Sequence, residues 1–339
     1  MSLNSLDLRS AAGMLAVQSV PRIGPKTALR VALTEDLRPL EERATAAPAD
    51  LEAAYRDAKE QMQRWEQDGL HVLALFDERY PETLRQLHEP PPLLWVRGDV
   101  ALLSDARMGA VIGTREPSRF GITAAECFSD ALADAGYGVV SGLAKGCDTI
   151  AHTRALEKGA RTIAVMGGGL DRIYPAENKG LASDILASGG TLVAEQPLGA
   201  RPIGAHLISR DRLQSGLAAG LMVAQTGVKG GSMHTVRFAA EQGRPVFCPE
   251  PGESGPKSDG LRALVSTPAR RLPEVLPAWK QSVQLARRLG DRPVAAAVKR
   301  EEVEQLVDDL ERVLLMRDGD PDKFHRPTED GQSAEAAAR

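Results

Sequence analysis

The fold is decided between residues 108 and 142, which read MGAVIGTREPSRFGITAAECFSDALADAGYGVVSG. Two short apolar runs, 108–113 and 137–142, enclose an amphipathic stretch of helical length at 121–135. Strands that are apolar throughout are typical of a parallel sheet covered by helices on both faces. This strand–helix–strand unit therefore predicts an α/β fold.

The same alternation continues along the chain. Further apolar runs of strand length lie at 161–167, 190–195, 220–225 and 244–250. The amphipathic stretches between them lie at 147–159, 178–188, 205–218 and 232–243. The pattern predicts a Rossmann-like, doubly wound and mostly parallel sheet across residues 105–271.

The N-terminal flank has a different character. Residues 1–68 are expected to form a small helical domain, because two short apolar-periodic runs surround residues 20–25 and a further helix is predicted over about 49–68. Residues 69–104 are expected to supply an edge strand and an extended connector, since successive prolines disfavour helix in the residues before them.

The C-terminal flank gives weaker signals. Residues 272–318 are expected to form a helical extension that ends in an amphipathic helix over 298–318, which packs on the main body or on a partner subunit. Residues 319–339 are polar and are expected to be disordered.

Composition limits the class of protein. The chain has 339 residues, of which 42% are hydrophobic and 26% charged, as expected for a soluble globular protein. No apolar run approaches the ~20 residues of a membrane span, and the N-terminus does not resemble an export signal. The three cysteines are too dispersed for a disulfide framework or a zinc site. We therefore expect a cytoplasmic protein without membrane contact and without a structural metal.

The charge distribution is uneven along the chain. The formal net charge is −4 overall, with −4 over residues 1–104, +3 over 105–271 and −3 over 272–339. A mildly basic centre permits a polyanionic ligand without requiring one.

Ligands of open parallel sheets bind at the carboxyl ends of the strands, so the segments after each strand are the candidate site. The first is GTREPSRFG at 113–121, where Gly113 allows close approach of a ligand backbone, Thr114 and Ser118 offer hydroxyls, and Arg115 offers a guanidinium. The helix that follows would add its free N–H groups to an anion site. An ordinary turn with Ser118 as helix N-cap explains the same residues.

The second segment, SGLAKGCDTIAH at 141–152, is small and glycine-rich. Gly142 and Lys145 are its candidate phosphate-binding residues. Asp148 and His152 are four residues apart on one helical face, where a structural contact is the more common explanation than an acid–base pair. His152 lacks a second ligand at metal-binding spacing.

The third segment, GGGLDRIYPAENKGL at 167–181, is the richest. Gly168 permits close approach, Arg172 and Tyr174 suit cation–π contact or base stacking, and Asn178 is placed to cap the next helix. Tyr174 could instead simply cover the end of the sheet.

Two later segments complete the candidate site. Arg210 and Arg212 bracket Asp211, and a flexible glycine loop leads into a helix whose first turn carries Ser232 and Thr235, a second possible anion site at a helix terminus.

The motifs favour binding over catalysis. The segments match neither the dinucleotide-binding GxGxxG nor the P-loop, GxSxG is absent, and no carboxylate pair is obviously placed for hydrolysis. We therefore predict no cofactor, no catalytic residues and a ligand with repeated phosphates.

These segments also carry a resemblance to a known family. The similar stretches are PPPLLWVRGD, VIGTREPSRFG, VVSGLAKGCDTIAH, IAVMGGGLDRIYPAENKGLA, RFAAEQGRPVF and the PG of PEPGESG, all within residues 90–260. They resemble the DprA/Smf family of DNA-processing proteins, and the run GLDRIYPAEN is the most specific. The N-terminal VPRIGPKTALR is similar to that family's helical leader, which is SAM-like or helix–hairpin–helix-like.

The resemblance implies a function. Family members bind single-stranded DNA without sequence preference, form homodimers and help to load the RecA recombinase during natural transformation. The positions that match the family's DNA-contacting and basic motifs are Arg115, Lys145, Arg172, Asn178, Arg210 and Arg212. The sequence departs from the family where Asp211 replaces an Asn, Gly230 a Ser and Arg262 an Asn, and where the optional C-terminal winged helix is not recognisable.

Two other hypotheses remain open. The protein could be a nucleotide-binding sensor or a nucleoside-phosphate hydrolase of the same Rossmann-like superfamily, in a mobile-element or defence setting, although the PGGxGTxxE-like motif of those hydrolases is absent and Glu195 is the only obvious carboxylate at a strand end. The protein could also be a scaffold with a decayed DNA groove that acts mainly through protein contacts.

Overall fold

A computed structural model describes residues 6–20, 23–34, 48–251 and 255–316 of the chain. Its strands are β1 (Leu70–Ala74), β2 (Leu93–Gly98), β3 (Met108–Ile112), β4 (Gly138–Ser141), β5 (Thr162–Met166), β6 (Thr191–Ala194), β7 (Gly220–Val223), β8 (Val246–Pro249) and β9 (Ala296–Val298). Its α-helices are α1 (Ala11–Ser19), α2 (Pro25–Thr34), α4 (Pro48–Gln67), α5 (Glu82–Arg85), α6 (Arg119–Asp134), α7 (Cys147–Glu157), α8 (Lys179–Ala187), α9 (Gly204–Gly216), α10 (Ser232–Glu241), α11 (Asp259–Ser266), α12 (Leu272–Val275), α13 (Val283–Leu289) and α14 (Val303–Met316).

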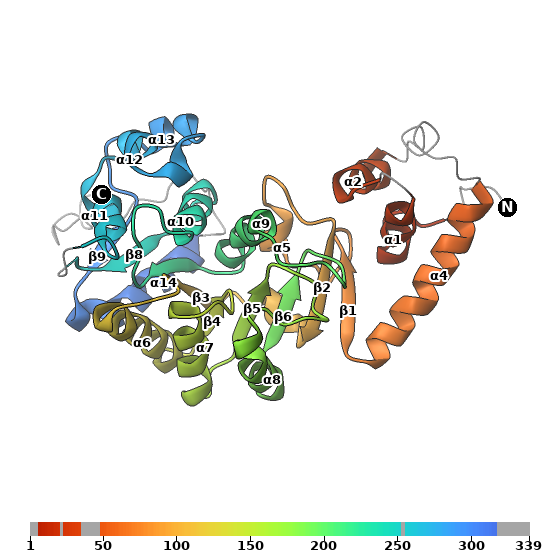
Figure 1. The fold of residues 1–339 in the computed structure, drawn as a ribbon, viewed down its shortest axis with the longest axis horizontal. Coiled ribbons are helices and arrows are strands. Elements are labelled where there is room, and N and C mark those ends of the chain that lie inside the picture. Colours follow the sequence, from red (N-terminus) through yellow and green to blue (C-terminus); the bar gives the residue numbers. More distant parts are fainter. Residues whose placement is uncertain (1–5, 21–22, 35–47, 252–254, 317–339) are drawn as a thin grey trace, which may run out of the picture.

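The described strands form one nine-stranded sheet in the order β1-β2-β6-β5-β4-β3-β7-β8-β9 (Figure 1). All pairs from β6 to β9 are parallel, whereas β2 runs antiparallel to both β1 and β6. From β3 the chain winds outward to β6, then returns to place β7 on the other side of β3. The predicted Rossmann-like, mostly parallel sheet is confirmed, and its topological switch point lies between β3 and β7.

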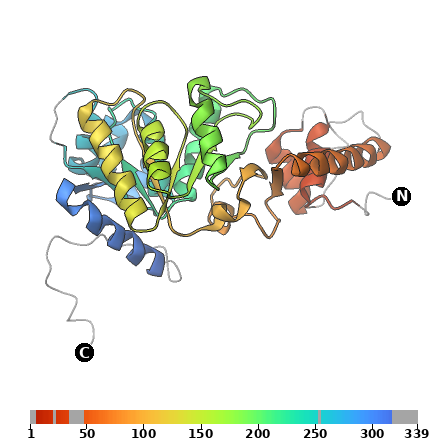
Figure 2. The same cartoon turned by 90° about the horizontal axis from the view of Figure 1, so that it is seen from below.

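Helices cover the sheet in two layers. The helices α6, α7 and α8 pack side by side on one face, and α14 lies against α6 on the same face (Figure 2). The helices α9 and α10 pack against each other on the opposite face. This arrangement explains why the parallel strands are apolar throughout, since β3, β4 and β5 are buried along their whole length.

Both flanks extend the same sheet. The edge strand predicted within residues 69–104 is β1, and the Pro-rich connector contains β2, an inner strand that pairs with β6 through Trp95 and Ala194. At the other edge, the C-terminal extension contributes β9, which pairs with β8 and which the sequence pattern did not indicate. Because β9 and a 3₁₀ turn at Arg300–Glu302 precede it, the last helix begins at Val303 rather than at residue 298.

The N-terminal helices have their own small core. Val17, Ala28, Val31 and Leu51 are among its buried side chains, and α1 packs along α4. The N-cap residue of α1 is Ser10, whose hydroxyl accepts from the Gly13 N–H at 3.1 Å. Part of the hairpin-like leader motif, residues 21–22, and the predicted disordered tail lie outside the described residues.

The C-terminal extension is tied to the main core by Trp279. This residue lies in a 3₁₀ turn at Pro277–Trp279, is fully buried and belongs to the same apolar cluster as β5 and β7 residues. Among the described residues, none of the helices combines the length and apolar character that crossing a membrane needs.

Candidate nucleic-acid interface

The segments that follow the parallel strands are bonded to one another at the carboxyl edge of the sheet. At the switch point, the Thr114 N–H donates to the Gln225 carbonyl at 2.8 Å, and the Cys147 N–H donates to the Thr114 carbonyl at 3.1 Å. Further along, the Gly169 N–H donates to the Ala200 carbonyl at 3.0 Å. The loops therefore form a connected rim rather than independent, separate turns.

The β3 loop combines close packing with one exposed cation. A Cβ at Gly113 would lie 2.5 Å from the Cys147 sulfur, so the close contact between this loop and α7 requires glycine. Arg115 is exposed and forms no ion pair with any residue that the structure describes. Its guanidinium is available for a ligand from solvent.

Ser118 is the N-cap residue of α6, but its side chain makes no capping bond. Its backbone N–H donates to Oε1 of Gln225 at 2.9 Å, and its hydroxyl accepts from Nε2 of the same residue at 3.0 Å. Thr114 behaves similarly, because its hydroxyl accepts from the Glu116 N–H at 3.3 Å. Both predicted hydroxyls thus shape the β3 loop.

Gln225 lies at the carboxyl edge of the sheet, and the sequence analysis did not single it out. It is fully buried directly after β7 and also donates to the hydroxyl of Ser258 at 3.0 Å, so one side chain joins three segments at the switch point. The signal available in the sequence was the polar side chain of Gln225 at the end of the apolar run 220–225, which otherwise predicts a buried strand.

The buried side chain of Asp148 stabilises the backbone of the β4 loop. The carboxylate of Asp148 accepts from the Gly142 N–H at 3.1 Å and the Ala144 N–H at 3.3 Å. Leu143, between them, has a left-handed backbone with φ 56°, a strained conformation for a non-glycine residue. Lys145 at the loop tip is exposed and pairs with Glu177.

Asn178 stabilises that strained loop. It occupies the N-cap position of α8, as expected, but the predicted side-chain cap is wrong: its buried Nδ2 donates to the Leu143 carbonyl at 2.8 Å and to the Thr149 hydroxyl at 2.9 Å. The segment after β5 therefore supports the segment after β4.

Arg172 and Tyr174 lie at the exposed part of the β5 loop. Arg172 forms no ion pair within the described part of the chain, and Tyr174 is 45% exposed. A ring this accessible is not buried as a cover for the end of the sheet. Gly168 is buried at the start of the loop, where a Cβ would approach the Ala200 carbonyl to 3.0 Å.

Arg210 is placed inside the protein, not on the surface of the rim. It is 5% exposed, its Nη1 donates to the Val165 carbonyl at 2.5 Å, and its Nε lies 3.2 Å from the Asp211 carboxylate. A Cβ at Gly142 would overlap its guanidinium, so this glycine admits the arginine instead of a ligand. The structure thus assigns Gly142 and Arg210 to the internal support of the β4 and β5 loops.

Arg212 is also engaged with protein groups. Its guanidinium binds both carboxylate oxygens of Glu195, at 3.0 and 2.6 Å, and its Nε donates to the Glu89 carbonyl at 3.0 Å. Burial raises the pKa of Glu195, but the hydrogen bonds and charge of Arg212 outweigh it and hold that pKa below its ordinary value. This ion pair connects the end of β6 to α9.

The two predicted hydroxyls of the α10 segment also interact with protein groups. Thr235 is buried and hydrogen-bonds the Asp211 carboxylate, whereas the half-buried Ser232 donates to the Thr226 hydroxyl at 2.9 Å. Lys229 in the preceding loop is exposed.

Asp148 and His152 do not form the pair that their spacing allowed. The Asp148 carboxylate serves the β4 loop, while Nδ1 of the fully buried His152 lies 2.7 Å from the Thr162 hydroxyl. Burial, with the charge of Arg210, lowers the pKa of His152 to about 3, so this imidazole is neutral. Among the described residues, no three His, Cys, Asp or Glu side chains come together as a metal site.

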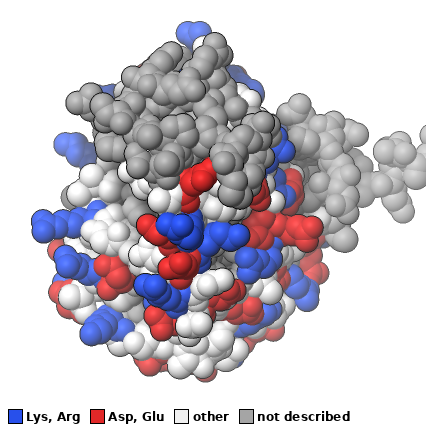
Figure 3. All heavy atoms as spheres, turned by 90° about the vertical axis from the view of Figure 1, so that its right-hand side faces the viewer, with Lys and Arg blue, Asp and Glu red and all other residues white. Residues whose placement is uncertain are grey.

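The predicted residues therefore separate into two groups. The exposed cations and ring at the rim are Arg115, Lys145, Arg172 and Tyr174. The residues that brace the loops from inside are Gly142, Gly168, Asn178, Arg210, Arg212 and Thr235. Away from the rim, at the N-terminal end of the molecule, basic and acidic side chains are interspersed on the described part of the surface (Figure 3).

Asp211 makes the stability of this support depend on pH. Burial raises the pKa of Asp211 to about 7, against the opposing charge of Arg210, so the folded state holds a proton that the unfolded chain releases near pH 3.8. The free energy of unfolding should then fall as pH rises from about 4 to about 7. We expect Asp211→Asn to flatten this slope, measured by urea unfolding at a series of pH values.

The control for that experiment is Asp184→Asn, which neutralises an exposed carboxylate on α8. It should leave the slope unchanged. Identical slopes in the Asp211→Asn variant and the parent would show that Asp211 titrates near its ordinary pKa.

The fold and the rim define a Rossmann-like α/β protein with exposed cations along the carboxyl edge of its sheet. Residues 71–281 match the family model described as DNA recombination-mediator protein A. The chain is 32% identical to the DNA processing protein DprA of Bacillus subtilis over 230 residues, which cover 68% of this chain and 77% of that protein. It is 38% identical to the protein Smf of Escherichia coli over 59% of this chain and 53% of that protein, so it spans about half of the Smf length. The chain belongs to the DprA/Smf family of DNA-processing proteins, which confirms the resemblance.

Solved structures agree with this assignment. DprA of Streptococcus pneumoniae superimposes with a TM-score of 0.63 at 28% identity, over 76% of this chain and 92% of that one. DprA of Helicobacter pylori, described for its single-stranded DNA binding mode, gives a TM-score of 0.55 at 26% identity, over 72% of this chain and 96% of that one.

Proposed function

We propose that this protein binds single-stranded DNA along the exposed rim and acts as a recombination mediator. The observation that carries the proposal is the position of Arg115 and Arg172, two exposed guanidiniums without ion pairs among the described residues, on either side of Lys145. The Helicobacter pylori relative binds single-stranded DNA, which supports the same ligand here.

The rim loops are contiguous enough to follow one strand. A Cβ at Gly146 would lie 2.6 Å from the Arg115 carbonyl carbon, so the β3 and β4 loops touch. Lys145 reaches Glu177 of the β5 segment. Phosphates of a flexible strand could then contact the three cations in succession, and Tyr174 could stack on one base, contributing ~1–3 kcal/mol.

Backbone contacts of this kind recognise no sequence. With ~3 phosphates neutralised, the logarithm of the association constant should fall with the logarithm of salt concentration at a slope of about −2. We expect Arg115→Ala combined with Lys145→Ala to reduce the slope to about −0.7 and to weaken binding of oligo-dT at low salt at least ~10-fold. Fluorescence anisotropy across a salt series measures both quantities.

The matched control removes one arginine and one lysine elsewhere. Arg288→Ala with Lys280→Ala removes two exposed cations of the C-terminal extension, so the net charge of the protein changes by the same amount as in the rim variant. This pair should leave affinity and slope close to the parent. If the rim pair behaved like the control pair, the rim would not be the DNA site.

Mediator action is the second part of the proposal. We infer that the protein works in the cytoplasm as a homodimer that protects the strand and helps a RecA-type recombinase to load on it. The test is recombinase ATPase activity on DNA coated with single-strand-binding protein, with the parent and the Arg115→Ala, Lys145→Ala variant. The geometry does not favour the nucleoside-phosphate hydrolase alternative, because the Glu195 carboxylate is held by Arg212 and by the Ser209 hydroxyl.

A further inference from the structure

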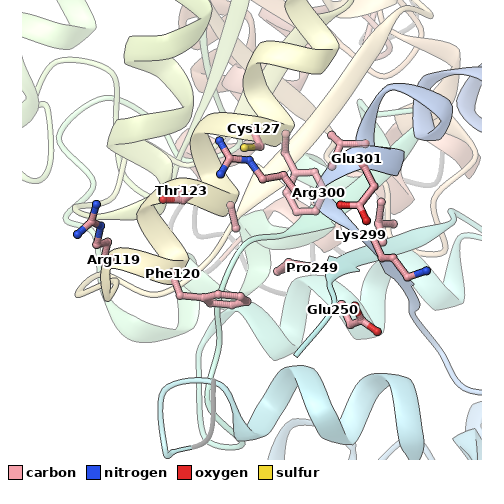
Figure 4. Close-up of a pocket in the computed structure, with 13 residues that line it drawn as sticks. Arg119, Phe120, Thr123, Cys127, Pro249, Glu250, Lys299, Arg300 and Glu301 are labelled. Carbon is pink, nitrogen blue, oxygen red and sulfur yellow. The ribbon is translucent and has the colours of Figure 1, made fainter. Parts of the chain in front are cut away.

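A cavity lies at the carboxyl ends of β8 and β9, between α6 and the segment from β9 to the start of α14 (Figure 4). The four exposed rim residues Arg115, Lys145, Arg172 and Tyr174 are not part of its lining. Its volume is about 410 Å³, within the lower range of small-molecule sites. One wall is a continuous face of α6, whose lining residues recur at helical spacing: Phe120, Thr123, Ala124, Cys127 and Phe128.

The opposite wall is formed by the ends of two strands. Pro249 of β8 pairs with Val298 of β9, and the Glu250 N–H donates to the Val298 carbonyl at 3.0 Å. Val303 at the start of α14 completes the apolar lining. The helices α6 and α14 pack against each other, whereas α9 and α10 pack together on the opposite face of the sheet.

Basic and acidic side chains lie together at one end of the cavity. Lys299 pairs with Glu302, and its pKa is raised by that hydrogen bond and by the nearby carboxylates of Glu250 and Glu301. These groups largely neutralise one another at one end of the cavity.

Arg119 and Arg300 provide the other charges. Both are exposed and line the cavity, and neither forms an ion pair with any residue in the described ranges. Figure 4 shows the Arg300 guanidinium beside Cys127 and the Phe120 ring at the opposite side of the opening. In the same view the Arg119 guanidinium points outward, away from that of Arg300. An aromatic and aliphatic chamber with one available guanidinium suits a flat, apolar body that carries an anionic group.

We propose that this cavity is a binding site for a mononucleotide, a planar base with one phosphate. The base would pack among Phe120, Val298 and Val303, and the phosphate would meet Arg300. The Glu250 carboxylate would accept from an amino group of the base. The nucleotide has two possible sources, a free mononucleotide or the terminal unit of a DNA strand, which share this chemistry.

Cys127 is a built-in reporter for occupancy. It lines the cavity and is partly exposed, whereas Cys147 and Cys248 are buried. Bound adenosine monophosphate should therefore slow the alkylation of Cys127 by N-ethylmaleimide and leave the two buried thiols unaffected. Residue-resolved mass spectrometry follows each thiol in the full chain.

The variants test the two halves of the site. Arg300→Ala should weaken adenosine monophosphate ~10-fold, as loss of one charge-assisted contact would, and Arg300→Lys should restore part of the affinity. Thr123→Trp should fill the chamber and abolish protection. Arg312→Ala, an exposed arginine on α14 outside the cavity, is the matched control and should bind like the parent. Adenosine, which lacks the phosphate, should protect only weakly.

The outcomes separate the two sources and separate this site from the rim. Protection by adenosine monophosphate alone assigns a free nucleotide, and equal protection by 5′-phosphorylated oligo-dT assigns a strand end. Protection should persist in the Arg115→Ala, Lys145→Ala variant, whatever that variant does to DNA binding. Alkylation of Cys127 at the same rate with either probe, or protection unchanged by both Arg300→Ala and Thr123→Trp, would overturn the proposal.

Discussion

Arg210→Ala is expected to lower the free energy of unfolding by about 3–5 kcal/mol, because it removes the cation from a buried charged cluster. The guanidinium lies beside Asp211, and its charge also acts on Asp148. Without it both buried carboxyl groups would lose the cation beside them, and the Val165 carbonyl would lose its 2.5 Å hydrogen bond. Urea unfolding near neutral pH measures the loss.

Two comparisons make this prediction specific. Arg172→Ala, which removes an exposed arginine of the same rim, should change stability by less than about 0.5 kcal/mol. Arg210→Met with Asp148→Asn and Asp211→Asn removes the whole charge cluster and should regain much of the stability, since a buried ion pair is worth little over neutral groups. A loss for Arg210→Ala no larger than for Arg172→Ala would contradict the internal role of Arg210.

Trp279→Ala is also expected to lower the free energy of unfolding by about 3–5 kcal/mol. The indole is fully buried in the main core cluster together with Leu213 and Leu272. Truncation would leave a large apolar void between the C-terminal extension and the helices α9 and α10. Thermal and urea unfolding should both show the loss, as one cooperative transition if the extension is part of the core.

Trp279→Phe is the matched control. Within the described part of the chain the indole Nε1 has no hydrogen-bond partner, so phenylalanine keeps most of the apolar contact and removes an unsatisfied donor. Its effect should be far smaller than that of alanine. Separate transitions for the extension and the sheet, with the sheet unaffected by Trp279→Ala, would show that residues 272–298 fold on their own.

The fold could be predicted because its signals are local and long. The apolar run at 108–113 and the helix at 121–135 became β3 and α6 with ends shifted by at most two residues. The strand β9 could not be found in this way, because AAV is three residues long and pairs with β8, about fifty positions earlier in the chain. Its place depends on a long-range partner that no local pattern encodes.

The site could be predicted only in part, and a comparison of Arg115 with Arg210 shows why. Arg115 and Arg210 both occur in segments near strand ends, yet one is exposed and the other is 5% exposed. A usable signal existed for Arg210, since Leu213 and Leu217 follow it at i+3 and i+7 and are both buried. Residues that share the apolar face of an amphipathic helix support the interior, whereas a loop arginine without that pattern is free to meet solvent.

The left-handed turn at Leu143 has a consequence for the thermodynamics of association. Its conformation is set in advance by Asn178 and by the Asp148 carboxylate, so a bound strand need not order it. The conformational entropy lost on binding would then come mainly from the nucleic acid, the more flexible partner. Calorimetry with oligonucleotides of different stiffness should therefore show that the unfavourable entropy of binding changes with the stiffness of the oligonucleotide. The contribution of the protein to this entropy should stay nearly constant.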